Sequence, residues 1–186
     1  MVSFVVRRAK ASDYDQIVDL QLRNMGDNLT EEQRRDGFLS GYFDAEMLAA
    51  ANENLAVVVC ADGDRIAGFV CLTTPRFTRQ NEVATAMMEK LKEETIFGKQ
   101  FDEWNACLYG PVCIEREYRG VGLFERLYKG LPQFSEQCNL LVCLVAVGNQ
   151  RSIAAHSKVG MTIVSEFEWS GRKFVIMAES MNKLTS

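Results

Sequence analysis

A short apolar strand runs into a glycine-containing turn and from there directly into an amphipathic helix, and this junction constrains the fold of the chain most. The segment from Val112 to Leu127 reads VCIEREYRGVGLFERL, with the letters RGVG at residues 119–122. Glycines at such a junction leave backbone N–H groups uncovered at the start of a helix, where free donors and the helix dipole favour a phosphate or pyrophosphate. The sequence therefore predicts an anion-binding loop here.

Size and charge narrow the class of protein. With 186 residues, 47% of them apolar, the chain can bury one sizeable core, and we expect a single domain over residues 1–186. The net charge of −4 and the lack of a lysine-rich tract disfavour a nucleic-acid partner. The apolar run at the N-terminus is too short for a secretory signal, and no later run approaches membrane-spanning length. We therefore expect no membrane partner and a cytoplasmic location.

The six cysteines lie mostly in apolar, strand-like runs. None forms a C-x-x-C pair and the chain has a single histidine, so a closed zinc site is disfavoured and we expect no bound metal. Free cysteine behaves as a small buried apolar residue. We expect reduced core thiols at Cys60, Cys71, Cys107, Cys113, Cys138 and Cys143.

Apolar spacing, caps and turn residues predict an alternation of strands and helices, and hence a mixed α/β fold. The predicted strands are Ser3 to Arg7, Leu55 to Cys60, Arg65 to Thr73, Ala106 to Ile114, Asn139 to Val147, Met161 to Trp169 and Arg172 to Glu179. The predicted helices run from an N-cap at Ser12 to Met25, from Thr30 toward Gly37, from an N-cap at Asp44 to Ala51, and over 81–96, 122–129 and 150–158. Because proline is tolerated within a sheet mainly at an edge or a bulge, Gly110-Pro111 predicts a bulge in the fourth strand.

The segment from Arg76 to Glu103 is longer than a strand-to-strand turn requires. Its helix from Asn81 to Ile96 carries a methionine-bearing apolar stripe, which more often packs on a core than binds a partner. A lid or a dimer contact is the alternative for this helix. The final hairpin around Ser170-Gly171 is a second candidate surface for a homodimer.

Two segments in this predicted context resemble motifs of the GNAT N-acetyltransferase superfamily. RGVGLF at residues 119–124 is similar to the family's acyl-CoA pyrophosphate loop, R/Q-x-x-G-x-G/A, with Phe124 in place of the final small residue. NQRSIAAHSKVGM at residues 149–161 is similar to the family's N-x-x-A/S-x-x-x-Y-x-K-x-G-F segment. His156 stands there in place of tyrosine and Met161 in place of phenylalanine. The order of elements agrees with the family, which leaves 76–103 as a helical insert.

The resemblance implies a GNAT-like fold, in which a central mixed, largely antiparallel sheet is splayed between its fourth and fifth strands and flanked by helices. It implies acetyl-CoA as cofactor, with the pantetheine arm pairing like an extra strand along Val112, Cys113 and Ile114. The residues that it assigns to the cofactor are Val112, Cys113, Ile114, Arg119, Gly120, Val121, Gly122, Leu123, Phe124, Asn149 and His156.

Acyl transfer to an amine needs a neutral attacking nitrogen, a donor for the oxyanion that develops on the thioester and a proton for the leaving thiolate. The resemblance implies a backbone N–H near Val112 to Ile114 as the oxyanion donor. It also makes His156 the candidate acid, because imidazole titrates near neutral pH; a structural hydrogen bond or packing on the pantetheine is the alternative. Glu115 is the candidate base, and a solvated charge beside Arg116 is the alternative.

The expected acceptor is a primary amine on a small molecule or a peptide. Between Arg23 and Leu55 acidic residues exceed basic ones, and in the family this region forms part of the acceptor wall, so a negative field would attract a cationic amine. Ordinary solvated helix faces explain the same excess. Tyr109 either lines the acceptor side or belongs to the core.

Two functions remain open from the sequence. The first is an N-acetyltransferase, in which the amine attacks acetyl-CoA directly in a ternary complex. The second is a catalytically silent acyl-CoA-binding module, which the unusual His156 and the lack of an obvious base leave open. A Walker-type nucleotide site is disfavoured because no G-K-S/T follows the glycines.

Overall fold

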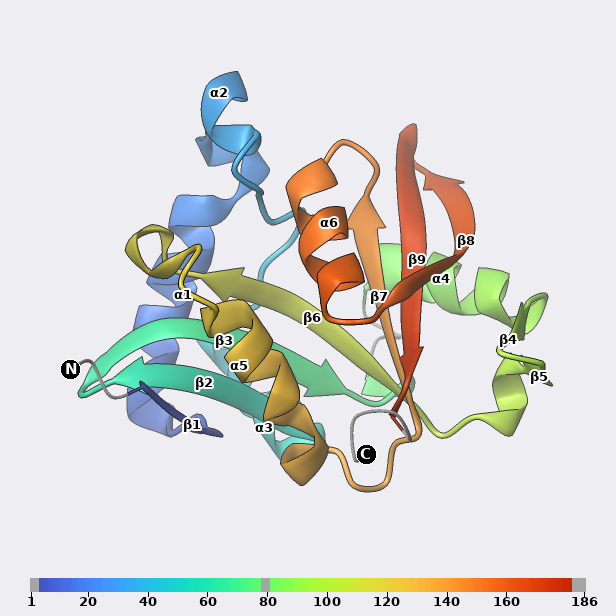
Figure 1. The fold of residues 1–186 in the computed structure, drawn as a ribbon, viewed down its shortest axis with the longest axis horizontal. Coiled ribbons are helices and arrows are strands. Elements are labelled where there is room, and N and C mark those ends of the chain that lie inside the picture. The colour runs from blue at the N-terminus through green and yellow to red at the C-terminus, as the bar shows by residue number, and fades with distance from the viewer. Residues whose placement is uncertain (1–3, 78–80, 182–186) are drawn as a thin grey trace.

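A seven-stranded sheet with helices on both faces forms the body of the molecule (Figure 1). The computed structural model describes residues 4–77 and 81–181. The strands of this sheet are β1 (Phe4–Arg8), β2 (Ala56–Asp62), β3 (Arg65–Thr73), β6 (Ala106–Ile114), β7 (Leu140–Ala146), β8 (Thr162–Trp169) and β9 (Arg172–Ser180). The α-helices are α1 (Tyr14–Asn24), α2 (Glu31–Arg34), α3 (Ala45–Asn54), α4 (Glu82–Lys92), α5 (Leu123–Lys129) and α6 (Gln150–Lys158), and β4 (Thr95–Ile96) with β5 (Lys99–Gln100) forms a separate hairpin. Six of the seven predicted strands thus lie within two residues of their expected bounds, while Ser3, at the start of the first, lies outside the described residues.

The strand order β1-β2-β3-β6-β7-β9-β8 places one parallel pair inside an otherwise antiparallel sheet. That pair is β6 with β7, the fourth and fifth strands in the order, and its register covers only 106–108 against 140–142. Beyond this short contact the two strands diverge, as Figure 1 shows. The predicted mixed, largely antiparallel sheet with a splay between its fourth and fifth strands is confirmed.

A bulge in β6 lies where the divergence begins. Val70 of β3 is opposite Val112, whereas Leu72 is opposite Tyr109, so two residues of β6 face a single residue of β3. Those two residues are Gly110, whose φ of +124° favours glycine, and Pro111, which has no N–H to donate. The bulge predicted from Gly110-Pro111 is confirmed.

Side chains on alternate positions of the strands supply two apolar faces. On β2, Val58 and Cys60 belong to the core that also holds residues of α5, whereas Val57 and Val59 belong to the core with α1 and α3. This period-2 alternation explains why nearly every residue of β2 is buried. In Figure 1 the helices α5 and α6 lie on the near face of the sheet.

The insert covers the far face of the second half of the sheet. Met87 and Leu91 of α4 are buried in a third core cluster, together with residues of β6, β7 and β9. The packing interpretation of the methionine stripe is therefore confirmed. The predicted helix is too long, because the chain turns at Phe97 and Gly98, both with positive φ, and Ile96 lies in the β4–β5 hairpin. Residues 78–80 of the insert lie outside the described residues.

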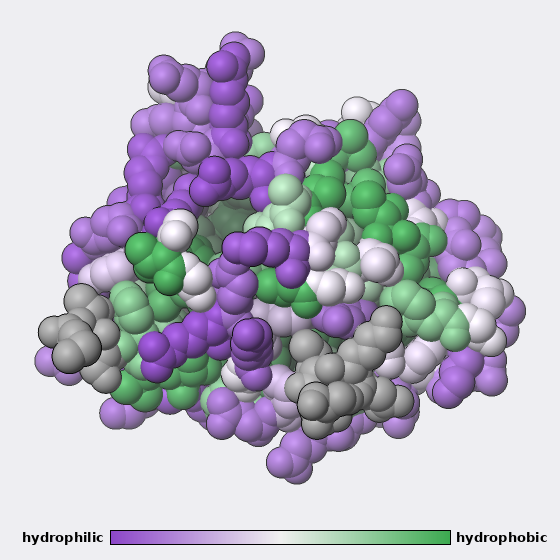
Figure 2. All heavy atoms as spheres, viewed as in Figure 1, coloured by the Kyte–Doolittle hydropathy of each residue, from purple (hydrophilic) through white to green (hydrophobic). Residues whose placement is uncertain are grey.

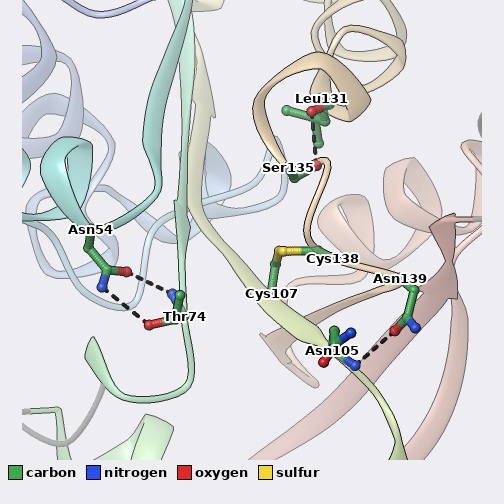
Figure 3. Close-up of a disulfide and its surroundings, with 8 residues drawn as sticks. All are labelled: Asn54, Thr74, Asn105, Cys107, Leu131, Ser135, Cys138 and Asn139. Atoms are coloured by element: carbon green, nitrogen blue, oxygen red, sulfur yellow. Dashed lines mark hydrogen bonds between the residues drawn. A yellow bond between two sulfur atoms is a disulfide. The ribbon is translucent and has the colours of Figure 1, made fainter.

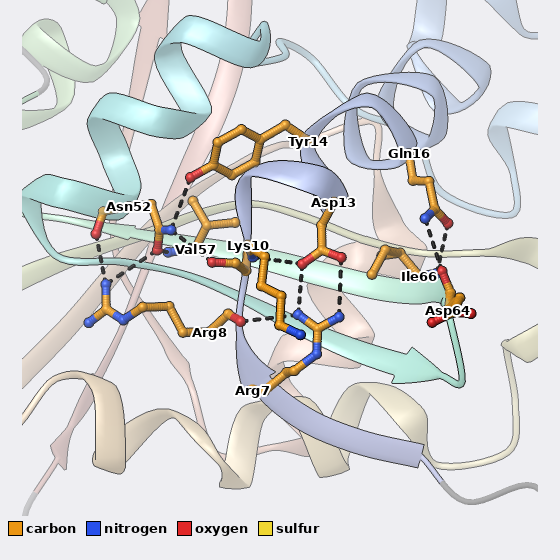
Figure 4. Close-up of polar contacts among 11 residues, drawn as sticks. Arg7, Arg8, Lys10, Asp13, Tyr14, Gln16, Asn52, Val57, Asp64 and Ile66 are labelled. Atoms are coloured by element: carbon orange, nitrogen blue, oxygen red, sulfur yellow. Dashed lines mark hydrogen bonds and ion pairs between the residues drawn. The ribbon is translucent and has the colours of Figure 1, made fainter.

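The predicted N-cap at Ser12 is wrong, whereas those at Thr30 and Asp44 are confirmed. Ser12 lies inside a 3₁₀ turn, Ala11–Asp13, which precedes α1. Asp13 holds that turn, since its carboxylate accepts hydrogen bonds from Lys10 N at 2.7 Å and from the Arg7 guanidinium at 2.7 and 3.1 Å (Figure 4). A carboxylate that can pair with a cation as well as with an amide stabilises this turn more than a hydroxyl would.

The expectation of six reduced thiols is also wrong, because Cys107 and Cys138 form a disulfide with a Cα–Cα distance of 5.8 Å (Figure 3). It joins the first part of β6 to the loop that precedes β7, beside the short parallel contact between these strands. Asn139 reinforces the same place, since its Oδ1 accepts from Asn105 N at 2.9 Å and its own N–H donates to Asn105 O. The partners are 31 residues apart, so no local spacing revealed the pair. The other four cysteines are buried free thiols, as expected.

Candidate active site

Two clefts meet beside the splay. The first, the loop cleft, has a volume of about 390 Å³ and lies between the 119–125 loop, α6 and the segment 36–39. The second, the splay cleft, has a volume of about 1420 Å³ and lies between the diverging ends of β6 and β7, with α3, α4 and the β8–β9 turn around it. Figure 2 shows a recess on the near face between α2 and α6. The residues shared by both clefts are Phe38, Leu39, Val112, Asn149, Ser152 and His156.

The glycine loop presents free backbone donors to the loop cleft. Gly120 and Gly122 both have a φ of +80°, and a Cβ added at either would meet no atom within 4 Å. Within the described part of the chain, the N–H groups from Gly120 to Phe124 donate to no protein acceptor. Adjacent free amides at the start of α5 favour an anion.

The Arg119 side chain is occupied by protein acceptors. Its Nε donates to Ile114 O at 2.9 Å, one terminal nitrogen donates to Asp36 O at 2.9 Å, and the other to Asn24 Oδ1 at 2.7 Å. The guanidinium therefore ties β6, the end of α1 and the segment after α2 together around the loop cleft. An anion in the loop would meet backbone amides rather than this side chain.

The remaining side chains of the loop point in different directions. Val121 is 65% exposed and does not line the cleft, whereas Leu123 is buried in the core. Phe124, the departure from the family pattern, packs its ring edge on His156 with a centroid distance of 5.1 Å. The extra bulk at this position thus contacts α6 and leaves the amides uncovered.

Backbone groups of β6 face the splay. Glu115 N donates to Ala67 O on β3, while the Ile114 carbonyl accepts from Arg119 on the opposite side. Because successive backbone groups alternate sides along a strand, the N–H groups of Val112 and Ile114 face the splay. Val112 lines both clefts and so offers a donor where they meet. The Cys113 side chain is buried on the other face, and burial raises the pKa of its thiol to about 11.

Asn149 holds the segment that covers the junction of the clefts. Its Oδ1 accepts from Ser152 N at 3.3 Å and so caps α6, while its Nδ2 donates to Phe38 O at 2.7 Å. With Arg119 bound to Asp36 O, the segment 36–38 is fixed from two sides. Neither a motif nor an apolar periodicity indicated Phe38 or Leu39, which lie in an irregular segment.

His156 lies between the clefts and is 3% exposed. Its Nδ1 is 2.7 Å from Ser152 O, and its Nε2 is the one buried side-chain nitrogen or oxygen among the described residues that lacks a hydrogen-bond partner. Burial lowers the pKa of His156 below its ordinary value, and the hydrogen bond to Ser152 offsets only part of this effect. The neutral form is therefore favoured at neutral pH, which argues against the expected role as a resident acid.

Glu115 is not brought to either cleft. Its carboxylate accepts from Arg23 at 2.6 Å and from Arg116 N at 2.9 Å, on a separate surface of the molecule. Burial alone would raise the pKa of Glu115, but these hydrogen bonds outweigh burial and lower it. A carboxylate engaged in this way is a poor proton acceptor, and the geometry favours the structural alternative for this residue.

The splay cleft carries charges of both signs. Its acidic residues are Asp44 and Glu46, from the region between Arg23 and Leu55, and Glu82 from the insert. Its basic residues are Arg76 and Arg172. Asp44 is partly engaged, because it caps α3 through Met47 N at 2.8 Å. Two aromatic residues that line this cleft, Trp169 at the end of β8 and Phe174 of β9, had no functional signal in the sequence. Tyr109 both belongs to the core and lines this cleft.

Two structural findings concern residues 4–77 and 81–181. No three His, Cys, Asp or Glu side chains in these ranges are grouped as a metal site. None of the helices in these ranges has the length and apolar character that crossing a bilayer requires.

Comparison with known proteins places the geometry in a family. The model of the acetyltransferase (GNAT) family matches residues 14–161. Similar solved structures include a GNAT-family acetyltransferase from Streptococcus agalactiae, with a TM-score of 0.69, 14% identity and 95% of each chain covered. Another is yncA from Salmonella typhimurium with its cofactor acetyl-CoA, with a TM-score of 0.58, 14% identity, and 96% of this chain and 94% of that chain covered.

A third similar structure is an aminoglycoside N(6')acetyltransferase from Legionella pneumophila, with a TM-score of 0.60, 11% identity, and 98% of this chain and 94% of that chain covered. No curated protein matches the chain. At these identities the structures establish the shared fold, and the family model covers most of the sequence. The chain belongs to the GNAT acetyltransferase family.

Proposed function

We propose that this protein transfers the acetyl group of acetyl-CoA to a primary amine of a small molecule or a peptide, by direct attack in a ternary complex. The observation that carries the proposal is the meeting of two clefts at Val112 and His156. One cleft has free amides for an anion and the other has room for an acceptor. Direct transfer needs such a junction, because both reactants must reach one point.

The residues of the loop cleft fit coenzyme A. Free N–H groups from Gly120 to Phe124 suit a pyrophosphate, and no side chain fills the space above the two glycines. The splay-facing groups of Val112 and Ile114 suit an extended amide-bearing arm, which would pair as an added strand. When bound, acetyl-CoA supplies the acyl group as a thioester. The N–H of Val112 would stabilise the oxyanion at the junction.

The splay cleft supports an amine acceptor without fixing its identity. Its carboxylates at Asp44, Glu46 and Glu82 favour a cation, whereas Arg76 and Arg172 favour an acidic or carboxylate-bearing part of the same acceptor. An acceptor that carries both signs, such as an amino-acid amine or a peptide, satisfies this lining best. A homodimer, the absence of a nucleic-acid partner, a cytoplasmic location and a single domain over 1–186 stay predictions.

Calorimetry and thiol release test the proposal. Coenzyme A should bind with measurable heat, and acetyl-CoA with a panel of polyamines, aminoglycosides, amino-acid amines and basic peptides should release free thiol with at least one acceptor. The absence of heat with millimolar coenzyme A would refute the cofactor assignment. Binding without thiol release from any acceptor would instead favour the silent acyl-CoA-binding module.

A further inference from the structure

The strongest unexplained feature of the molecule is the unsatisfied Nε2 of His156. A buried polar atom without a partner costs free energy, and native structures rarely retain one without a use. Nε2 has no hydrogen-bond partner among the described residues, and His156 lines both clefts. It is also the single histidine of the sequence, which makes it directly observable.

The hydrogen bond at the other ring nitrogen fixes the tautomer. Nδ1 is 2.7 Å from the Ser152 carbonyl oxygen, which can only accept, and 3.3 Å from the Ser152 hydroxyl oxygen, which can accept or donate. A bare Nδ1 would point its lone pair at the nearer carbonyl oxygen, which is repulsive. The neutral imidazole therefore carries its proton on Nδ1 and donates it to Ser152. Nε2 is left with a free lone pair, so it can accept a proton and has none to give.

The surroundings of the ring separate the two clefts. Tyr109, which lines the splay cleft only, packs on the imidazole at a centroid distance of 5.4 Å, and Phe124, which lines the loop cleft only, packs on it at 5.1 Å. The imidazole thus lies between one ring on the acceptor side and one on the cofactor side.

The titratable groups on the elements around His156 are either buried groups with raised pKa values or groups engaged with a partner other than the imidazole. On β6, burial raises the pKa of Tyr109 well above its ordinary value, and on β7 burial raises the pKa of Cys143 to about 12. On α5, burial raises the pKa of Tyr128, whose hydroxyl donates to Glu179 of β9 at 2.5 Å. At the rim, Glu125 of α5 and Lys158 of α6 pair with each other at 2.6 Å. The carboxylates of Glu179 and Glu125 are thus engaged by Tyr128 and Lys158, and the causes of the lowered pKa of His156 are burial and, in the opposite direction, its hydrogen bond to Ser152.

We propose that Nε2 of His156 is the first proton acceptor of the transfer, so that the histidine takes a proton from the acceptor before it gives one to sulfur, instead of starting the reaction as a protonated acid. This inference rests on the proposed function. As the N–C bond forms, the proton that leaves the acceptor nitrogen passes to Nε2. As the C–S bond breaks, the same proton passes to sulfur, which leaves as a thiol, and the imidazole returns to its neutral form. Ser152 O holds the Nδ1 proton throughout.

Nitrogen NMR of the ring tests the tautomer without any turnover. In protein labelled with ¹⁵N and free of a histidine tag, the one imidazole should show a protonated Nδ1 and an unprotonated Nε2 at pH 7. On acidification the ring should titrate below 6.5, the ordinary value for histidine. A protonated Nε2 with a bare Nδ1, or an imidazolium at pH 7, would overturn the proposal even if the protein binds coenzyme A and is active.

The pH dependence of transfer distinguishes an acceptor from a donor. The rate should fall as the pH decreases through the pKa measured for His156, whereas a resident acid would lose activity as the pH rises through it. Protonation of the acceptor amine gives its own limb, so two acceptors with different amine pKa values should be compared. The limb due to His156 should stay fixed between the two acceptors and be absent in His156→Gln.

Substitution and chemical rescue separate chemistry from packing. His156→Phe and His156→Gln should lower kcat by at least about a hundredfold, with coenzyme A affinity within a few-fold of the wild type, since general acid–base groups contribute about 10²–10⁴-fold. In His156→Ala, added imidazole should restore part of kcat, with no gain in the wild-type protein. A kcat within threefold of the wild type in His156→Phe would overturn the proposal. Absent binding of coenzyme A to wild-type protein would refute the proposed function instead.

Discussion

Reduction of the Cys107–Cys138 disulfide should lower the stability of the protein markedly. The bridge closes a loop of 31 residues, and the chain-entropy relation for a cross-link gives about 3.7 kcal/mol at 25 °C for a loop of that length. For a domain of this size each kcal/mol shifts Tm by about 2–4 °C, so the loss corresponds to a decrease in Tm of about 7–15 °C. The effect should be concentrated where β6 and β7 meet, because Cys107 lies in that contact and Cys138 lies two residues before it.

Thermal unfolding with and without reductant measures this difference. The double variant Cys107→Ala/Cys138→Ala provides the matched control, since its Tm should lie near that of the reduced protein and should not respond to reductant. Thiol titration of the fully unfolded protein, purified without reductant, should find four reactive thiols. Six reactive thiols, or a Tm that reductant leaves unchanged, would refute the reasoning and restore the expectation of reduced core cysteines.

Three other perturbations have defined outcomes. Gly122→Glu should weaken coenzyme A binding by about two orders of magnitude in calorimetry. The reason is that each lost charge-assisted hydrogen bond costs about 1.5–3 kcal/mol and that the carboxylate repels a pyrophosphate. The control is Gly63→Glu, at a positive-φ turn outside both clefts, which carries a similar backbone cost and should bind coenzyme A normally. Phe124→Ala should admit water to the imidazole and raise the pKa of His156 toward 6.5 in the NMR titration, since burial is the main cause of its low pKa; an unchanged or lower pKa would contradict that cause. Hydrogen bonds lower the pKa of Asp13 despite its burial, so its contribution to stability is present above its unfolded pKa and is lost as the pH falls through its folded pKa. In denaturant unfolding, Asp13→Asn should therefore lose less stability at acid pH than the wild type does. Parallel stability curves against pH would contradict this contribution of Asp13.

Local signals in the sequence predicted most of the fold. The strand from Arg65 to Thr73 and the strand from Ala106 to Ile114 have the predicted bounds, because each is a mostly apolar run with polar residues on both sides. The helix α6 likewise has its predicted bounds, with Asn149 as its cap. Each of these features depends on neighbours within a few residues, which a single sequence displays directly.

The features that the sequence did not reveal depend on contacts between distant residues. The ion pair between Arg23 and Glu115 spans 92 positions, and it changes a candidate base into an engaged surface carboxylate. The free lone pair of His156 depends on which ring nitrogen contacts the Ser152 carbonyl. Local sequence patterns do not predict this orientation of the ring. Local motifs thus indicated the candidate site, whereas the direction of proton transfer that we propose at His156 depends on contacts that only the structure shows.

The Arg119 side chain carries a broader consequence. An arginine in an anion-binding motif is usually taken to contribute its charge to the anion, yet here each nitrogen group already has a protein acceptor. Arg119→Lys would keep the charge and lose these three hydrogen bonds. The variant should therefore disturb the splay cleft as well as the loop cleft, because Asp36 and the adjoining chain lose an attachment. In this molecule the motif arginine is an architectural requirement, and its retention across similar sequences would report on shape rather than on phosphate contact.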